Sequence, residues 1–320
     1  MGDSASVAQS NAERFRVLDP EGFVRTHLND GKHTDGDRPL DKYRSTSLQL
    51  SIVSTAHGSA IVKQGRTTVI CGVTGELCTF DQTKCHFRVD STPGVAASPF
   101  CHEQISHATD VINGLFDRNL LVDRADLDIE TDKLGWTLYC DCHVVDADGA
   151  LLDCILLALV AALSDTRLPD VSLPAPTTDD HNDDQIKVAK SKKPIQLKDL
   201  KPKIDVSKER RIPVQSLVSS TFTFVPRVES IGGNSNDAEI IVDPNQEEGM
   251  FAPNLLTVIR GPDHQLYGVH RLASKCAPGV GCDQMHTLDN SLMQECALKA
   301  QARWAQCSSL IERAMKLCSA

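Results

Sequence analysis

Hydrophobic and polar residues alternate along residues 47–53 and 136–144 in the first half of the chain, and this pattern predicts half-buried β-strands. Two further strands are predicted at residues 59–63 and 67–73, which flank a short turn. Gly65 lies in this turn and can adopt a positive φ, so a tight hairpin is predicted there. Helical spacing predicts a helix over residues 105–116, and the almost wholly apolar run 151–164 predicts a helix buried on every side.

The second half of the chain repeats this order of strands followed by a helix. Strands are predicted at residues 214–224, 239–242, 255–260 and 266–272, with a turn at 261–264 and a long helix over 283–318. Strands and then helices, twice in one chain, favour an α+β fold of two similar lobes, each with a β-sheet packed against helices.

A charge-segregated stretch separates the two halves. Residues 170–184 hold five Asp and no Lys or Arg, whereas residues 187–211 hold ten Lys or Arg against three acids. Neither part has much apolar periodicity, so we expect a mobile segment. The expected organisation is a disordered tail at 1–12, an N-terminal extension with a short docking helix at 13–37, a first domain at 38–168, a charged flexible linker or loop at 169–212 and a second domain at 213–320.

Charge and composition narrow the class of function. Lys and Arg number 33 against 43 Asp and Glu, so the net charge is −10, which disfavours a protein that mainly grips duplex DNA. The longest apolar stretch has ten residues, at 154–163, so no membrane span is expected. Gly2 and Ser6 formally fit a myristoylation pattern, but we interpret this end as an ordinary polar tail. Twelve cysteines without a secretory signal or a CxxC pair predict a reducing compartment and no metal site, and no cofactor motif occurs.

Short motifs follow one another in a recognisable order along most of the chain. They are residues 35–40 with Tyr43 and Arg44, residues 54–63 and 65–73, residues 138–141, Asp148 with Gly149, residues 159–163 and residues 241–244. In this order they resemble the RNase PH family, and within it the non-catalytic ring subunits of the eukaryotic RNA exosome core. The resemblance implies six RNase PH-like subunits in a ring around an RNA channel, with S1/KH-type cap subunits, associated nucleases and RNA as partners. It also implies work in the nucleus, including the nucleolus, and in the cytoplasm.

The family's reaction is phosphorolysis, in which phosphate attacks the last 3′ linkage of RNA. Active members place a small residue, a hydroxyl and an arginine at the start of the buried helix, where backbone N–H groups hold the phosphate. The corresponding positions here are Gly149, Ala150, Leu151, Leu152 and Asp153. The side chains are aliphatic, and Asp153 adds a negative charge that would repel phosphate. A tight anion site is therefore not expected.

Two further requirements of the reaction are missing from the sequence. The acidic turn with Asp243, Glu247 and Glu248 is interpreted as solvated and as helix-capping, and the following residues 249–255 hold no carboxylate. Residues 91–103, where RNA-clamping arginines should lie, hold no Arg or Lys. The sequence thus predicts no catalytic residue, and a subunit that supports RNA processing and decay without catalysing it.

Other features remain open at this stage. Residues 79–86 are expected to form a loop near the channel mouth, where Lys84 and Arg88 could contact RNA phosphates. Lys190, Lys192 and Lys193 are candidates for a nuclear signal. Two alternatives are retained. One is an active phosphorolytic exoribonuclease in which Arg118, Arg124 and Asp126 act as displaced catalytic residues, and the other is a stand-alone RNA-binding adaptor. His102, His107 and His143 are interpreted as ordinary surface or core residues.

Overall fold

The computed structural model describes residues 12–36, 38–79, 84–130, 134–173, 202–226, 238–252, 254–273 and 290–318. The first lobe is built on a mixed sheet with the strand order β1-β2-β3-β6-β4, and the short β5 pairs with β6 at one end. The strands are β1 (Thr46–Leu50), β2 (Gly58–Gln64), β3 (Thr67–Thr79), β4 (Cys85–Ser91), β5 (Asp128–Glu130) and β6 (Leu134–Asp146). Gly65 forms the β2–β3 hairpin with φ +59°, as the sequence predicts.

Helices cover one face of this sheet, and the burial of the strands shows why. Buried and half-buried residues alternate along β3, so one face of the sheet meets the helices and the other meets solvent. The helices of this lobe are α3 (Pro93–Ala96), α4 (Pro99–Asp117), α5 (Arg124–Leu127) and α6 (Leu151–Asp165). The predicted helix at 105–116 is the C-terminal part of α4, which begins behind the N-cap Ser98.

The second lobe contains a four-stranded antiparallel sheet in the order β10-β9-β11-β12. Its elements are β9 (Val218–Pro226), β10 (Ala238–Val242), α8 (Gln246–Phe251), β11 (Asn254–Arg260), a 3₁₀ turn (Pro262–His264), β12 (Leu266–Ala273) and α9 (Asn290–Cys318). Each predicted strand of this half is present, although β9 begins four residues later than expected. No helix in the described part of the chain is long and apolar enough to cross a membrane.

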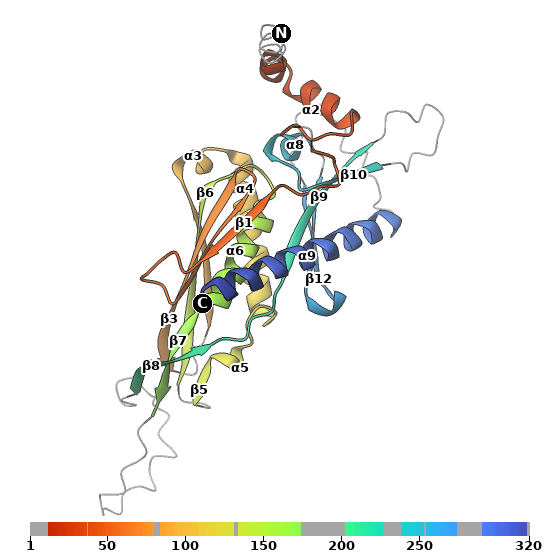
Figure 1. Cartoon of the computed structure of the whole chain (residues 1–320). Helices are drawn as coiled ribbons and strands as arrows, with labels where there is room; N and C mark the ends of the chain where they lie inside the picture. The colour runs from red at the N-terminus through yellow and green to blue at the C-terminus, as the bar shows by residue number, and fades with distance from the viewer. Residues whose placement is uncertain are drawn as a thin grey trace, which may run out of the picture.

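Helix α6 joins the two lobes. It packs against β2 and β3 of the first sheet and against β9 of the second, and α9 contacts β1, β9 and β11 beside it (Figure 1). With sheets on two sides, α6 has almost no solvent-facing surface, and all but one of its residues are buried. This explains the nearly unbroken apolar run in its sequence.

The N-terminal extension docks on the second lobe. Helix α2 (Pro20–Asn29) starts behind the capping Asp19, whose carboxylate accepts a hydrogen bond from Gly22 N. Val24 and Leu28 of α2 form a small apolar cluster with Leu40 and Ile241. The cluster holds the extension beside α8, at the top of Figure 1.

The structure corrects the expected linker at residues 169–212. Its two ends form an antiparallel ribbon of β7 (Arg167–Ser172) and β8 (Lys203–Arg211). The pairing runs from Arg167 opposite Arg211 to Ser172 opposite Lys203, with a register shift between Pro169 and Asp170. Leu168 and Val171 are buried against the first lobe and hold β7 in place. The pairing was missed because β8 has a charged sequence, and its partner lies more than 30 residues away.

The expected loop at residues 79–86 is also corrected at both ends. Strand β3 continues through Thr79, and β4 starts at Cys85 and runs parallel to β6. Phe87 of β4 is buried in the core, and β4 packs against α4. This packing explains why residues from Cys85 onward form a strand and not a loop. Lys190, Lys192 and Lys193, the tail up to residue 11 and residues 283–289 of the predicted long helix lie outside the described residues.

Candidate functional site

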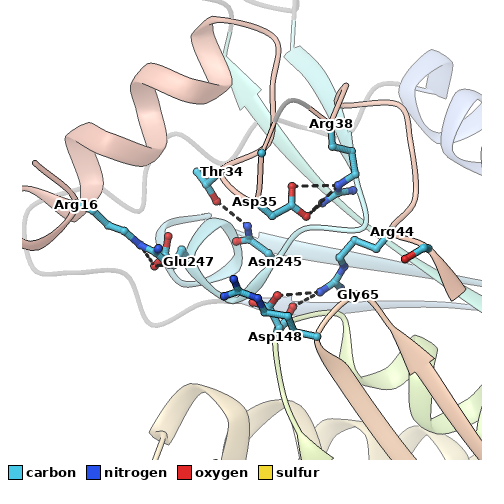
Figure 2. A pocket seen from close by; sticks show the side chains of 12 residues that line it. Arg16, Thr34, Asp35, Arg38, Arg44, Gly65, Asp148, Asn245 and Glu247 are labelled. Carbon is cyan, nitrogen blue, oxygen red and sulfur yellow. Dashed lines mark hydrogen bonds and ion pairs between the residues drawn. The ribbon is translucent and has the colours of Figure 1, made fainter. Parts of the chain in front are cut away.

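A polar cavity of about 450 Å³ lies where four distant segments converge. They are the N-terminal extension, the tip of the β2–β3 hairpin, the turn before α6 and the loop before α8 (Figure 2). The volume is in the range of ligand pockets, but the wall is mostly polar, unlike that of a typical ligand site.

Each of the three carboxylates that line this cavity lies beside an arginine. Arg38 Nη2 is 3.0 Å from Asp35 Oδ2, and Arg44 Nη1 is 3.5 Å from Asp148 Oδ2. Arg16 Nε donates to Glu247 Oε1 at 2.6 Å (Figure 2). Burial raises the pKa of Asp148, and the neighbouring Arg44 acts in the opposite direction. Two of these pairs, Arg16 with Glu247 and Arg44 with Asp148, are structural contacts between segments, whereas Asp35 and Arg38 lie three residues apart in one loop.

A buried ion pair lies behind the cavity. Arg44 Nε and Nη2 donate to the two carboxylate oxygens of Asp243 at 3.0 and 2.6 Å, and the Arg44 amide donates to the same carboxylate at 2.8 Å. The arginine also donates to the carbonyls of Asp148 and Gly149. Because both ionic side chains are almost fully buried, this pair fixes the start of β1 and the loop before α8 to the turn that begins α6.

A second buried pair holds the N-terminal extension. His33 Nδ1 lies 2.9 Å from Glu248 Oε2, and both side chains are fully buried. Glu248 also accepts from the Thr34 amide at 2.7 Å and forms a capping box with Asn245 at the start of α8. Burial tends to raise the pKa of Glu248, but the hydrogen bond and charge of His33 and the amides of Thr34 and Asn245 hold it below its ordinary value.

These contacts correct the interpretation of the acidic turn as solvated. Asp243 and Glu248 have no exposed side-chain surface, and Glu247 is partly exposed but paired with Arg16. Only the predicted capping role of this turn is confirmed, by Glu248 in the capping box. Spacing alone did not reveal the burial, because the partners of Asp243 and Glu248 lie about 200 residues earlier in the chain.

The turn that corresponds to the family's phosphate site is closed by the protein itself. Gly149 has φ +77°, and a Cβ there would lie 2.5–2.7 Å from backbone atoms of residues 244–246, so only glycine fits this close approach. Ala150 is the N-cap of α6 and supplies no side-chain cap. The Leu151 amide instead donates to Gln104 Oε1 of α4 at 3.3 Å, and the Leu151 and Leu152 side chains are buried. The side-chain amide of Gln104 thus occupies a backbone N–H group that could otherwise bind an anion at the helix N-terminus.

Asp153 does not face an incoming anion, contrary to the expectation that its charge would repel phosphate. Its carboxylate points into the core and accepts from Thr221 N at 2.8 Å and from Thr221 Oγ1 at 3.0 Å, tying α6 to β9. Burial, followed by the charge of Asp243, raises the pKa of Asp153 to about 6. The side chain points inward because α6 has a packed element on this side as well.

The contribution of Gln104 to stability, as the residue that caps α6, can be measured by mutation. We expect Gln104→Met, which keeps the bulk but removes the acceptor, to lower the free energy of unfolding by about 1 kcal/mol. The Leu151 N–H is left buried without a partner, and loss of the unpartnered Gln104 Nε2 offsets part of this cost. Urea denaturation checks this value. Ser106→Met on the exposed side of the same helix is the matched control, with an expected change of less than about 0.5 kcal/mol. Equal effects of the two changes would contradict the capping role.

The predicted RNA-contact residues lie on the first sheet, away from the cavity. Lys84 is exposed immediately before β4, and Arg88 is exposed on β4 with Asp90 and Asp141 at 3.0 and 3.3 Å. These acids partly neutralise Arg88, a feature that sequence spacing did not reveal. Neither Lys84 nor Arg88 lines the cavity.

The proposed displaced catalytic residues do not converge on the cavity. Arg118, Arg124 and Asp126 are absent from its lining. Arg118 Nε donates to the carbonyl of Gly114 on its own helix, and the Asp126 carbonyl accepts from Arg210 of β8.

The three histidines considered from the sequence are dispersed. His102 and His143 are exposed, and His107 lies half-buried against His270 with ring centroids 6.2 Å apart. Burial lowers the pKa of both residues of this pair. Sequence reasoning missed Arg16, His33 and Gln104, whose roles depend on tertiary contacts.

Comparisons with known proteins agree with this fold. The sequence profile of the 3′ exoribonuclease family, domain 1 (RNase_PH), matches residues 42–169. Exosome complex component rrp43 of Schizosaccharomyces pombe is 28% identical over 165 residues, which cover 48% of this chain and 60% of that protein. Exosome complex component Rrp42 of Sulfurisphaera tokodaii is 31% identical over 198 residues, which cover 59% of this chain and 68% of that protein.

Solved structures extend the likeness across both lobes. A chain of an archaeal exosome core superposes with a TM-score of 0.61 at 22% identity, covering 90% of this chain and 96% of the other. At this identity the match supports the fold, including the second lobe, which lies outside the matched profile. From the profile, the relatives and the shared two-lobed architecture together, this chain belongs to the RNase PH family.

Proposed function

We propose that this protein is a non-catalytic structural subunit of the RNA exosome core ring, which supports 3′–5′ RNA processing and degradation by binding RNA and positioning partner nucleases. The names of its relatives and its likeness to an exosome core chain support the assignment to such an assembly. The site described above supports the absence of catalysis by this chain.

The closed turn before α6 is the observation that carries the proposal. A phosphorolytic site needs free N–H groups and a cation to hold phosphate. Here the first amide of α6 is bonded to Gln104, and the side chains of Leu151, Leu152 and Asp153 are buried in the core. Arg44 donates to the Gly149 carbonyl, but its guanidinium is engaged by the buried Asp243.

The expected position of the catalytic acid points the same way. Asn254 stands in the stretch that has no carboxylate, and its Oδ1 accepts from Arg271 Nε at 2.8 Å. An amide held in this way cannot act as a general base at neutral pH, and its single side-chain oxygen is a weak metal ligand compared with a carboxylate. The stretch 91–103 also holds no Arg or Lys for the RNA backbone.

A phosphorolysis assay tests the proposal. We expect purified protein incubated with poly(A) and inorganic phosphate to release no nucleoside diphosphate above a protein-free blank, while an active RNase PH in the same buffer does so. Release by this chain would contradict the proposal and favour the active-exoribonuclease alternative. In that case Arg118→Ala, Arg124→Ala and Asp126→Ala would identify which residues act.

Assembly and RNA contact need separate measurements. We expect the chain to co-elute in gel filtration with RNase PH-like partner subunits and S1/KH-type cap subunits, because its fold is that of a ring subunit. Failure to co-elute, combined with RNA binding by the isolated chain, would favour the stand-alone adaptor.

At the predicted RNA contact, Lys84→Ala in the assembled ring should weaken RNA binding and reduce its salt dependence, because a phosphate contact releases counterions.

The proposed localisation is the nucleus, including the nucleolus, together with the cytoplasm. Fluorescence microscopy of the tagged chain tests it. Replacing Lys190, Lys192 and Lys193 by alanine should reduce the nuclear share if these residues form the import signal, since such receptors read a cationic run.

A further inference from the structure

We propose that the β7–β8 ribbon is a docking surface for a protein partner with an acidic, partly apolar face. The ribbon surface is defined here as Arg167, Lys203, Ile204, Val206, Lys208, Arg210 and Arg211. The inference rests on the proposed function only for the choice of the partner subunits used to test it.

The ribbon stands apart from both large sheets. It is a two-stranded sheet of its own and extends from the lower end of the first lobe (Figure 1). Strand β7 is anchored by the buried Leu168 and Val171, but eight of the nine residues of β8 are exposed. A two-stranded ribbon gains little stability by itself, so a partner that covers β8 would stabilise it.

Two aliphatic side chains of β8 are left in solvent. Ile204, directly opposite the buried Val171, is 49% exposed, and Val206 is 78% exposed. Both lie on a strand whose other residues are polar or charged. If a partner covered these two side chains, their burial would stabilise the complex by about 25 cal/mol for each Å² of apolar surface removed from water.

An irregularity in the ribbon holds Val206 outward. Asp170 pairs with Asp205 and Pro169 pairs with Glu209, so residues 206–208 have no partner in β7. Ser207 N and Oγ both donate to Asp205 Oδ1, at 3.1 and 2.6 Å, and close a local turn around Val206. The protruding valine is therefore preorganised, as bulged residues that direct a side chain often are.

The charges of the ribbon favour an acidic partner. Arg167 lies directly opposite Arg211, and like charges in this position destabilise a ribbon. Arg167 has one long contact with Glu209, at 3.4 Å, and Arg210 donates to the Asp126 carbonyl. Within the described residues, neither Arg210 nor Arg211 lies in a salt bridge. Carboxylates of a partner would relieve the repulsion between the arginines and complement a cationic spot on a chain of net charge −10.

The same features favour a protein over RNA. Asp170 and Asp205 face each other across the ribbon, and Glu209 precedes Arg210, so carboxylates interrupt the cationic surface. Such a surface suits a few separate acidic side chains better than the continuous line of charges of a phosphate backbone. RNA would also leave Ile204 and Val206 without an apolar partner. A protein face with apolar side chains and a few carboxylates satisfies both sets of groups.

Hydrogen exchange in the assembled state tests the docking surface. The probes are purified RNase PH-like neighbours and S1/KH-type cap subunits, mixed with the full chain. We expect backbone amides of β8 to exchange at least about tenfold more slowly in the assembly than in the free chain, because docking suppresses their opening. Protection that appears only after RNA is added would overturn the proposal in favour of an RNA contact.

A matched pair of variants gives the second readout. Val206→Asp with Arg211→Glu should weaken assembly at least about tenfold, which corresponds to 1.4 kcal/mol. The control Leu317→Asp with Lys316→Glu likewise replaces an aliphatic and a basic residue by acids at exposed positions near the end of α9, and it should stay within about twofold. Urea unfolding of each free variant shows that the chain still folds.

The outcomes separate the two proposals. An assembly that forms while β8 remains unprotected, or one that tolerates the ribbon variant as well as the control, overturns the docking surface alone. If the wild-type chain forms no assembly with these subunits, the proposed function is contradicted and the ribbon proposal fails with it.

Discussion

Replacement of Arg44 by alanine is expected to lower the free energy of unfolding by about 3–5 kcal/mol, the loss typical of breaking a buried ion pair. The change leaves the Asp243 carboxylate fully buried without its two guanidinium hydrogen bonds. It also releases the carbonyls of Asp148 and Gly149 from their donor. Urea denaturation followed by circular dichroism measures the change.

Two comparisons test whether burial of the charge is the cause. Arg88→Ala removes an exposed arginine with two acidic neighbours and should cost less than about 1 kcal/mol. The double variant Arg44→Met with Asp243→Leu removes both charges and should be less destabilised than Arg44→Ala, because the fully buried Asp243 carboxylate is no longer left without its arginine. If the double variant is less stable than Arg44→Ala, burial of the unpaired Asp243 charge is not the main cause of the loss of stability in Arg44→Ala.

Asp153→Asn is expected to change the dependence of stability on pH by about 3 kcal/mol between pH 4 and pH 7. Burial raises the pKa of Asp153 from 3.8 to about 6 in the folded protein. Between these values the folded state binds more protons than the unfolded state, so stability falls as pH rises through the window and the loss persists above it. The neutral amide does not ionise, so the variant should gain stability relative to wild type as pH rises, by roughly 1.4 kcal/mol for each pH unit of the shift.

Unfolding of both proteins across this pH range gives the required difference. The contributions of the titrating groups that both proteins share largely cancel when the variant is subtracted from wild type. Asp117→Asn makes the same chemical change at an exposed position at the end of α4 and is the matched control. A flat difference for Asp153→Asn would mean that its carboxylate is ionised as easily in the folded protein as in the unfolded chain.

The elements that the sequence predicts well depend on local patterns. Alternation identifies β1 and β6, because residues on one face of a strand recur every second position. Gly65 marks the hairpin between β2 and β3. The uniform apolarity of residues 151–164 likewise predicts a helix with no solvent-facing side, as α6 proves to be. Strands β7 and β8 carry no such pattern, since one is short and the other exposed, and their pairing depends on chain segments far apart.

The site is predictable in part for the same reason. The aliphatic side chains at Leu151 and Leu152 can be read directly from the sequence, and they already argue against a phosphate site. The direction in which the Asp153 side chain points cannot be read from the sequence, because α6 is apolar on all sides and no polar face indicates how the helix is rotated about its axis. The partners of Asp243 and Glu248 lie 199 and 215 residues earlier, where the chain gives no local signal that they meet.

The position of α6 between the two sheets has a consequence for how the chain comes apart. Neither sheet can keep its full apolar layer without this one helix, so the halves of the molecule should melt in a single transition. A fragment that ends after α6 would expose the helix face that packs on β9, and the complementary fragment would expose the matching face of its sheet. Separately expressed, the two fragments should be insoluble or molten alone and should regain native circular dichroism only when refolded together.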